Sequence, residues 1–398
     1  MIRHRGVLTA SSYLSMFFLG VGTAVIGAAS GNIGLTPYQT GLLISVQNVG
    51  FFVSVLASGA LADSSDKARL MSAGSFLLAV SFFLYYRWPA YSVNLLIMLF
   101  IGAGIGSYEG VADAMLLGIH DRRQGLHISV NHFFVTFGAL GITLYPIFLQ
   151  MDWRRSMVQS AAVVCALAVL FLFSQAGKGS GGGLTIRQRA KFLSTQGVLA
   201  VFILFAIFGV GIELGLTGLL PGFLRDLRGY SLVQSNLGLV IFLGGIAAGR
   251  MLLGLLTNRV PLLLMIRWLF AAATIFSFVL FFVPLPPAGT IVALALTGAG
   301  ISSLLPLLIT LTGMMYRDMS GMALGIVKLA VPLGGIMVPF IVSILSRWGS
   351  FQLALGIFPL LAAAGFLVLA AGGRRIQARI SAMTSPAPNR DTREEVGS

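Results

Sequence analysis

The feature that most constrains the fold is a succession of long apolar stretches separated by short polar segments. Inside a bilayer, backbone polar groups must bond within their own segment, so stretches long enough to cross a core about 30 Å thick predict transmembrane helices. The sequence therefore predicts an all-α membrane protein with twelve transmembrane helices. The stretches cover residues 7–29, 38–62, 70–87, 92–118, 126–150, 156–174, 197–222, 232–256, 261–283, 288–315, 320–346 and 350–372.

The composition agrees with a membrane protein and excludes several other classes. Of the residues, 57% are hydrophobic and 10% are charged, whereas soluble domains carry about 25% charged residues. Cys165 is the single cysteine, and the histidines lack a zinc-protease spacing. The glycine-rich segment at 177–183 does not match the G-x-x-x-x-G-K-[ST] pattern of a nucleotide-binding loop and follows no predicted strand. We expect a protein that is not an enzyme and binds no metal or cofactor, with a proton gradient as its energy source.

The net charge of +14 is explained by membrane topology rather than by nucleic acid. If the N-terminus is cytoplasmic, eighteen Lys and Arg residues fall in cytoplasmic segments, six fall on the opposite side and two lie within spans. Basic residues collect on the cytoplasmic side of membrane proteins. We therefore predict an integral plasma (inner) membrane protein with both termini cytoplasmic and no nucleic-acid partner.

The chain divides into two halves of six spans. The longest internal polar break predicts a flexible cytoplasmic linker at 175–196, between bundles at 1–174 and 197–372, and residues 373–398 read as a cytoplasmic tail. Each half repeats the pattern G-x-L-x-[DN], at Gly59 to Asp63 and at Gly254 to Asn258. Two related six-helix halves are typical of transporters that bind substrate at the interface between repeats.

Several motifs resemble those of known transporters. The stretch GALADSSDKAR (59–69) resembles the helix 2–3 loop signature of the major facilitator superfamily. Three further stretches are similar to motifs of one branch, the fucose/glucose–proton symporter family. They are GIGSYEGVADAMLL in span 4, NHFFVTFGALG (131–141) in span 5, and FGVGIELG (208–215) followed by GGIAAGRMLLG (244–254) in spans 7 and 8. This resemblance implies the major facilitator fold and a sugar as substrate, moved with protons.

Span 4 carries two carboxylates, Glu109 and Asp113, in an otherwise apolar run. Their i, i+4 spacing places them on one helix face, and two close carboxylates in a membrane titrate as a coupled pair. Residues 7–29 contain no carboxylate, although the resembled family often has one there. We predict that Glu109, with Asp113, couples transport to protons. The alternative is a structural role, with both neutralised by Lys328 or by Arg122 and Arg123.

Charged residues within membrane spans are costly and normally face a cavity or a partner. Glu213 is a candidate for binding substrate or for pairing with Arg250, and Lys328 for pairing with a carboxylate or for binding an anionic substrate. Neutral polar side chains in spans can bind hydroxyl groups or join helices to one another. The predicted substrate-binding residues are Glu213, Asn131, His132, Lys328 and Asn48.

A second set of charged residues lies at or near the cytoplasmic ends of spans. We predict that charge pairs there close the cytoplasmic side and break during alternation. The predicted gating residues are Asp63, Arg69, Arg250 and Arg259. The four tryptophans, including Trp268, lie at span ends and are predicted to anchor the chain at the membrane interface.

The sequence favours a proton symporter of a sugar or related small polar solute that works as a monomer in the lipid bilayer. A proton-driven exporter of drugs, metabolites or organic anions is the alternative. A membrane receptor or scaffold that transports nothing is a third hypothesis.

Overall fold

The computed structural model describes residues 4–62, 65–120, 124–148, 152–176, 195–257, 259–316 and 320–384. Within these ranges, eleven helices are long and apolar enough to cross a membrane. The helix α5 (Gln124–Phe148) adds a shorter apolar segment, Val130–Tyr145. The predicted all-α membrane fold is confirmed.

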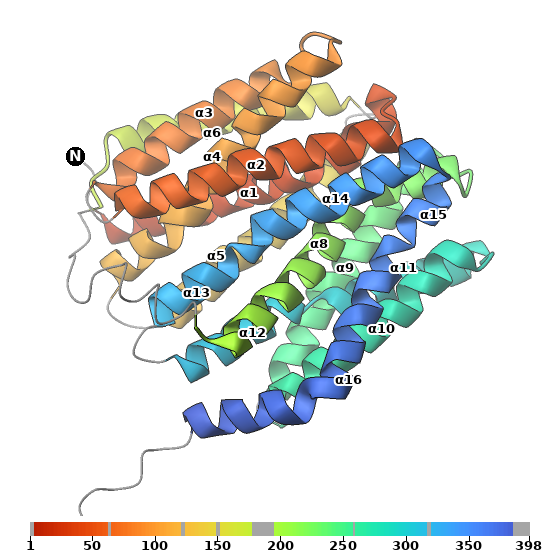
Figure 1. Ribbon diagram of the computed structural model, residues 1–398. Helices are drawn as coiled ribbons and strands as arrows, with labels where there is room; N and C mark the ends of the chain where they lie inside the picture. Colours follow the sequence, from red (N-terminus) through yellow and green to blue (C-terminus); the bar gives the residue numbers. More distant parts are fainter. Residues whose placement is uncertain are drawn as a thin grey trace, which may run out of the picture.

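The helices form two groups that follow the chain order (Figure 1). The first group is α1 (Arg5–Ile33), α2 (Pro37–Ala62), α3 (Lys67–Leu84), α4 (Tyr91–Ile119), α5 (Gln124–Phe148) and α6 (Trp153–Leu172). The second group is α8 (Gly197–Asp226), α9 (Leu232–Leu256), α10 (Leu262–Phe282), α11 (Pro287–Ile301), α12 (Leu304–Met315), α13 (Ser320–Lys328), α14 (Ala330–Trp348), α15 (Phe351–Leu355) and α16 (Ile357–Thr384).

Each of the last three predicted spans is interrupted. The breaks fall at Ser302 and Ser303, at Leu329 and at Gly356, each three or four residues before a proline: Pro306, Pro332 and Pro359. Proline has no N–H to donate to the carbonyl four residues earlier, and its ring crowds that carbonyl. The helical hydrogen-bond ladder therefore opens just upstream of each proline.

Helix α16 continues to Thr384 instead of ending near residue 372. Part of the segment that we assigned to a tail is therefore helical. The residues after Gly373 are good helix formers, and Ile376 and Ile380, one turn apart, are 9% and 5% exposed. Burial of these two side chains stabilises the turns of α16 beyond residue 372.

The N-terminal helices pack closely through glycines. A side chain at Gly102 of α4 would collide with the carbonyl of Gln47 in α2, and one at Gly138 of α5 would collide with the carbonyl of Phe17 in α1. These positions accept no Cβ without a shift of backbone, which explains the glycine-rich character of span 4. The glycine face of α4 therefore contacts α2.

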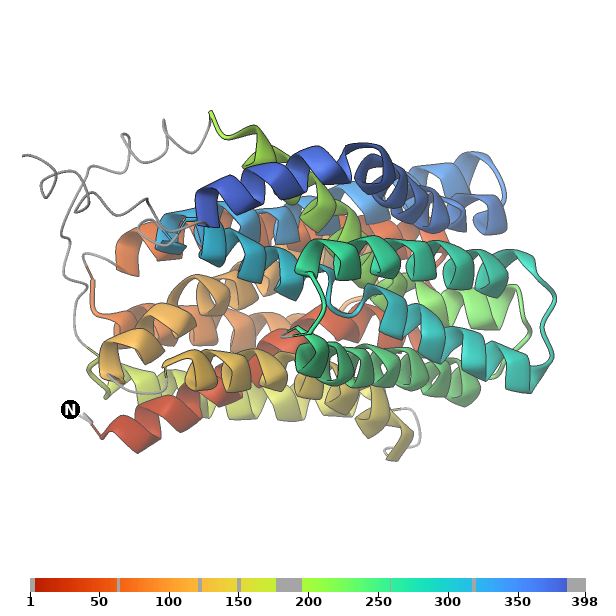
Figure 2. The ribbon, with the colours of Figure 1, turned by 90° about the horizontal axis from the view of Figure 1, so that it is seen from below.

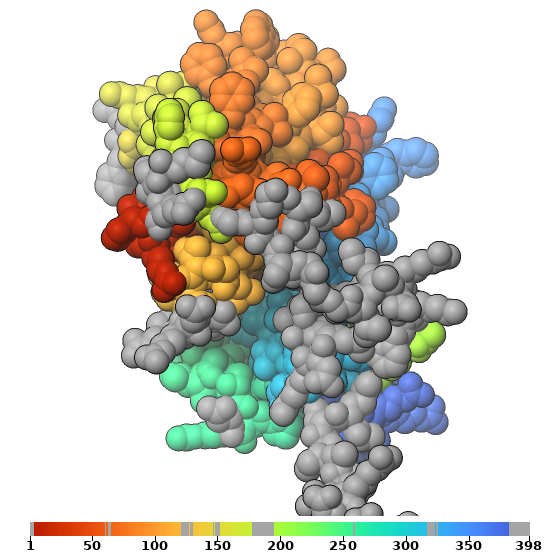
Figure 3. All heavy atoms as spheres, turned by 90° about the vertical axis from the view of Figure 1, so that its left-hand side faces the viewer, coloured from red at the N-terminus to blue at the C-terminus, as the bar shows by residue number. Residues whose placement is uncertain are grey.

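Both described ends of the chain lie at one end of the bundle, which we call the terminal end (Figures 1 and 2). At the opposite end, which we call the far end, the two halves are joined by hydrogen bonds. Ser343 donates to the carbonyl of Tyr38 (2.6 Å), and Asn236 to that of Ala28 (3.1 Å). A view onto the terminal end shows the N-terminal half (red to yellow) above green, teal and blue segments of the C-terminal half (Figure 3).

Candidate functional site

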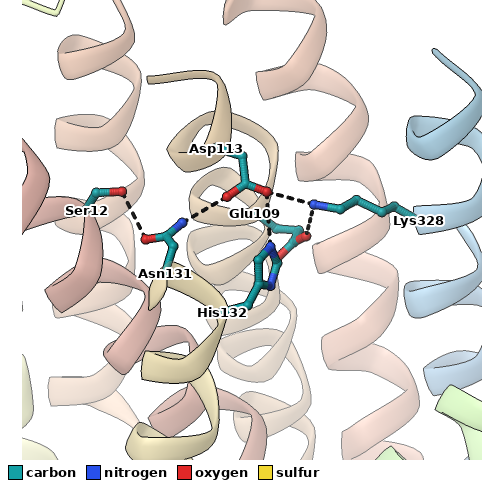
Figure 4. Close-up of polar contacts among 6 residues, drawn as sticks. All are labelled: Ser12, Glu109, Asp113, Asn131, His132 and Lys328. Carbon is teal, nitrogen blue, oxygen red and sulfur yellow. Dashed lines mark hydrogen bonds and ion pairs between the residues drawn. The ribbon is translucent and has the colours of Figure 1, made fainter. Parts of the chain in front are cut away.

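A cluster of charged side chains joins the two halves in the interior of the bundle (Figure 4). The ammonium of Lys328, at the end of α13, donates to Glu109 Oε1 at 3.1 Å and to Asp113 Oδ2 at 2.9 Å. Both carboxylates belong to α4. One residue of the C-terminal half thus binds the two span-4 carboxylates of the N-terminal half.

Asp113 has further partners on α5. Asn131 Nδ2 donates to Asp113 Oδ1 at 3.0 Å, and His132 Nε2 lies 3.1 Å from Asp113 Oδ2. Asn131 in turn accepts from Ser12 Oγ of α1 at 3.2 Å. The cluster of Glu109, Asp113, Lys328, Asn131, His132 and Ser12, which we call the central cluster, therefore draws on four helices.

The local sequence explains why Lys328 occupies this position. Pro332 has no N–H to bond the carbonyl of Lys328, so α13 ends at that residue and α14 starts at Ala330. A cation at a helix C-terminus is favoured by the helix dipole. The break therefore places an ammonium at a helix end that faces α4.

The charge of the central cluster depends on the protonation of His132. With His132 neutral, two carboxylates and one ammonium sum to −1. The side chains of Glu109, Asp113 and Lys328 remain 13%, 19% and 26% exposed, so solvent reaches them while the halves are joined at the far end. The cluster can therefore exchange protons.

The same carboxylates and imidazole have a spacing that a metal ion could use. The ligand atoms of Glu109, Asp113 and His132 lie within 4.8 Å of one another. Lys328 donates to both carboxylates, and a cation there would have to displace its ammonium. In this structure both carboxylates are therefore engaged by the ammonium of Lys328.

A second ion pair lies between α8 and α9. Arg250 Nη2 donates to both carboxylate oxygens of Glu213, at 2.8 and 3.0 Å. Its Nη1 donates to Thr136 Oγ1 of α5 at 3.1 Å, and its Nε donates to the carbonyl of Ser302 at 2.8 Å. Because Pro306 cannot donate to that carbonyl, the break between α11 and α12 frees the acceptor that Arg250 uses. Arg250 thus connects α8, α9, the α11–α12 break and the N-terminal helix α5.

The structure brings together five of the predicted coupling and substrate-binding residues and separates the other two. Glu109, Asp113, Asn131, His132 and Lys328 are all members of the central cluster. Glu213 has Arg250 as its partner, as the alternative interpretation anticipated.

Asn48 lies apart from the central cluster. It donates to the carbonyl of Ile44 in its own helix and packs against Gly335 of α14. Its role in substrate binding stays a prediction. No signal in the sequence indicates that α2 and α14 are aligned in this way.

The predicted gating residues are not gathered at one place. Asp63 lies outside the described residues, as do Arg122 and Arg123. Arg69 at the start of α3 and Arg259 after α9 are exposed, and neither forms an ion pair with another residue that the structure describes. Arg250 lies deeper and contacts Glu213 instead.

Three participants were missed by sequence reasoning: Ser12, Thr136 and the carbonyl of Ser302. Thr136 stands four residues after His132, so the helical repeat could have placed it on the same face. The Ser302 carbonyl could have been found as the group four residues before Pro306. No comparable signal marks Ser12.

Comparison with the sequence profiles of known families gives one match. The sequence profile described as the Major Facilitator Superfamily matches residues 7–311. No protein with a curated description matches the chain.

Solved transporter structures share the fold at low sequence identity. A bacterial homolog of the human lysosomal transporter Spinster, inward-facing and occupied, is 13% identical with a TM-score of 0.74, covering 98% of this chain and 100% of its own. The nucleoside transporter NupG is 14% identical with a TM-score of 0.73, covering 93% and 99%. The inward-open xylose transporter XylE from E. coli is 14% identical with a TM-score of 0.73, covering 92% and 96%.

Proposed function

The chain belongs to the Major Facilitator Superfamily, and we propose that it carries a sugar or related small polar solute by proton symport with alternating access. One observation carries the proposal: Lys328 of the C-terminal half binds Glu109 and Asp113 of the N-terminal half. The site lies between two halves that must move relative to each other for transport. Its ion pairs therefore change when the halves move.

Proton coupling follows from the charge of the central cluster. One proton on Glu109 or Asp113 would neutralise the net charge of −1 and remove half of the attraction that holds Lys328. The released ammonium would allow the halves to separate at this point. Conversely, deprotonation would restore the ion pairs of Lys328 and return the carrier to its starting conformation. A proton that enters across 100 mV supplies about 2.3 kcal/mol for this cycle.

Alternating access is supported by the distribution of contacts between the halves. The far end is joined by Ser343, Asn236 and Ser45, the last donating to the carbonyl of Ile336 at 3.0 Å. Arg250 and Lys328 form polar contacts across the halves in the interior. We propose that both sets exchange during the cycle, with Arg250 as a gating residue. The same role for Asp63, Arg69 and Arg259 stays a prediction.

A hydroxylated substrate fits the neutral polar groups that surround the charges. Asn131, His132, Thr136 and Ser12 offer directional donors and acceptors, which sugar hydroxyls require. Two solved structures with the same fold are transporters of xylose and of nucleosides, both hydroxylated solutes. The motifs that resemble the fucose/glucose–proton symporter family support the same substrate class.

Export of an organic anion is the second candidate, and the two cations favour it. Lys328 and Arg250 each bind carboxylates in the interior. The carboxylate of a substrate could replace one of these partners without leaving a cation unpaired. Under either function we propose a monomer with both termini in the cytoplasm.

Proton flux in liposomes tests the proposal. The purified protein is reconstituted around a pH-sensitive dye, and sugars, nucleosides and organic acids are added in turn. We expect sugar-dependent proton movement that Glu109→Gln and Asp113→Asn each reduce by at least about tenfold, because each variant removes one exchangeable charge.

Asp226→Asn is the matched control, because Asp226 pairs with Arg225 outside the central cluster. Its flux should stay within about twofold of the parent, since exposed pairs contribute little. Proton flux with organic acids but with no sugar would favour the second candidate. Equal proton flux from Glu109→Gln and the parent would show that Glu109 does not couple transport to protons.

A further inference from the structure

A groove between the start of α10 and the end of α16 has no role in the central cluster. It has a volume of about 900 Å³ and lies toward the terminal end. Two of its lining residues are arginines, Arg267 of α10 and Arg374 of α16. The groove is large enough to admit an organic ligand.

The groove is positively charged and lacks counterions on its own helices. Neither α10 nor α16 contains an Asp or Glu. The Nε of Arg267 is buried and has no hydrogen-bond partner among the described residues. A buried guanidinium N–H without an acceptor is costly. The unpaired donor therefore indicates that an anionic acceptor belongs here.

Apart from the arginines, Gln377 and Ser381, the lining of the groove is apolar. Leu263 and Leu264 line it from α10, and Leu369, Ala370 and Ala371 line it from α16. A free phosphate ion would leave these side chains uncovered. An acyl chain attached to the anion would cover them.

The position along the helices matches the boundary of a bilayer. Helix α16 has 28 residues, about 42 Å of helix against a hydrocarbon core of about 30 Å. Its last turns change direction near the terminal end (Figure 1). Trp268, 58% exposed next to Arg267, is a residue type that lies at the headgroup level. Arg267 and Arg374 therefore lie where lipid phosphates are found.

We propose that this groove binds an anionic phospholipid of the phosphatidylglycerol class. Arg267 and Arg374 hold its phosphate, and the leucines and alanines of α10 and α16 contact one acyl chain. Basic pockets between helices at the cytoplasmic surface bind such headgroups through charge. This inference is independent of the substrate and of proton coupling.

Native mass spectrometry of the delipidated full-length protein tests the inference. Phosphatidylglycerol, phosphatidylcholine and inorganic phosphate are titrated separately. We expect one phosphatidylglycerol to bind in preference to phosphatidylcholine. Arg267→Gln and Arg374→Gln should each weaken that binding about fivefold, the loss expected for one basic residue near the surface.

Arg375→Gln is the matched control, because Arg375 is the exposed neighbour of Arg374 and does not line the groove. Arg267→Lys keeps the charge but lacks the Nε donor, so it should bind more tightly than Arg267→Gln and less tightly than the parent, which separates loss of charge from misfolding. Equal weakening by Arg375→Gln and Arg267→Gln would overturn the site. Binding of inorganic phosphate that phosphatidylglycerol does not displace would also overturn it, as would equal affinity for phosphatidylcholine.

Discussion

Removal of the Lys328 ammonium should destabilise the protein more than removal of either carboxylate that it binds. In Lys328→Met, Glu109 and Asp113 keep their charges at 13% and 19% exposure, and the charge of the central cluster changes from −1 to −2. Removing one member of a buried pair costs about 3–5 kcal/mol. We expect about 3 kcal/mol, since Asp113 retains Asn131 and His132 as partners.

A second substitution should recover part of this loss. Lys328→Met combined with Asp113→Asn restores the net charge of −1, so the double variant should be more stable than Lys328→Met alone. Glu109→Gln alone should cost about 1.5 kcal/mol, because Lys328 still binds Asp113. Lys328→Met should therefore be less stable than both Glu109→Gln and the double variant.

Thermal unfolding in one detergent at pH 7.5, followed by tryptophan fluorescence, measures this order. At about 2 °C per kcal/mol for a chain of this size, Lys328→Met should lower the midpoint by about 6 °C. Arg69→Gln is the control, since Arg69 is exposed. A midpoint for Lys328→Met equal to that of the parent would refute the reasoning. A double variant no more stable than Lys328→Met would refute it as well.

Three further predictions concern other parts of the molecule. Arg250→Lys loses the two-pronged contact with Glu213 and should lower the unfolding midpoint by the equivalent of about 1–3 kcal/mol. Gly102→Ala should destabilise by about 1–3 kcal/mol in the same measurement, whereas Gly118→Ala, with open space around it, should not. Burial raises the pKa of Tyr86, in the loop between the membrane-spanning helices α3 and α4, to about 12. Stability should therefore fall as pH rises from about 10 to 12 in the parent and less in Tyr86→Phe, a difference that midpoints measured across this range would reveal.

The sequence by itself determined the membrane-spanning helices. Long apolar segments must satisfy their own backbone groups, so their lengths predicted the helices without knowledge of any partner. The i, i+4 spacing of Glu109 and Asp113 placed both on one face, and the breaks before Pro306, Pro332 and Pro359 follow from the missing N–H of proline. These are local properties of the chain.

The tertiary structure alone decided which charges meet. Lys328 is more than two hundred residues from Asp113, and the sequence left open whether it would pair or bind substrate. It likewise left open whether Glu213 would bind substrate or pair with Arg250, and it did not show that Asn48 would pack against Gly335. The contacts depend on how the halves pack, because helix periodicity fixes the face of a side chain but not the helix that lies opposite it.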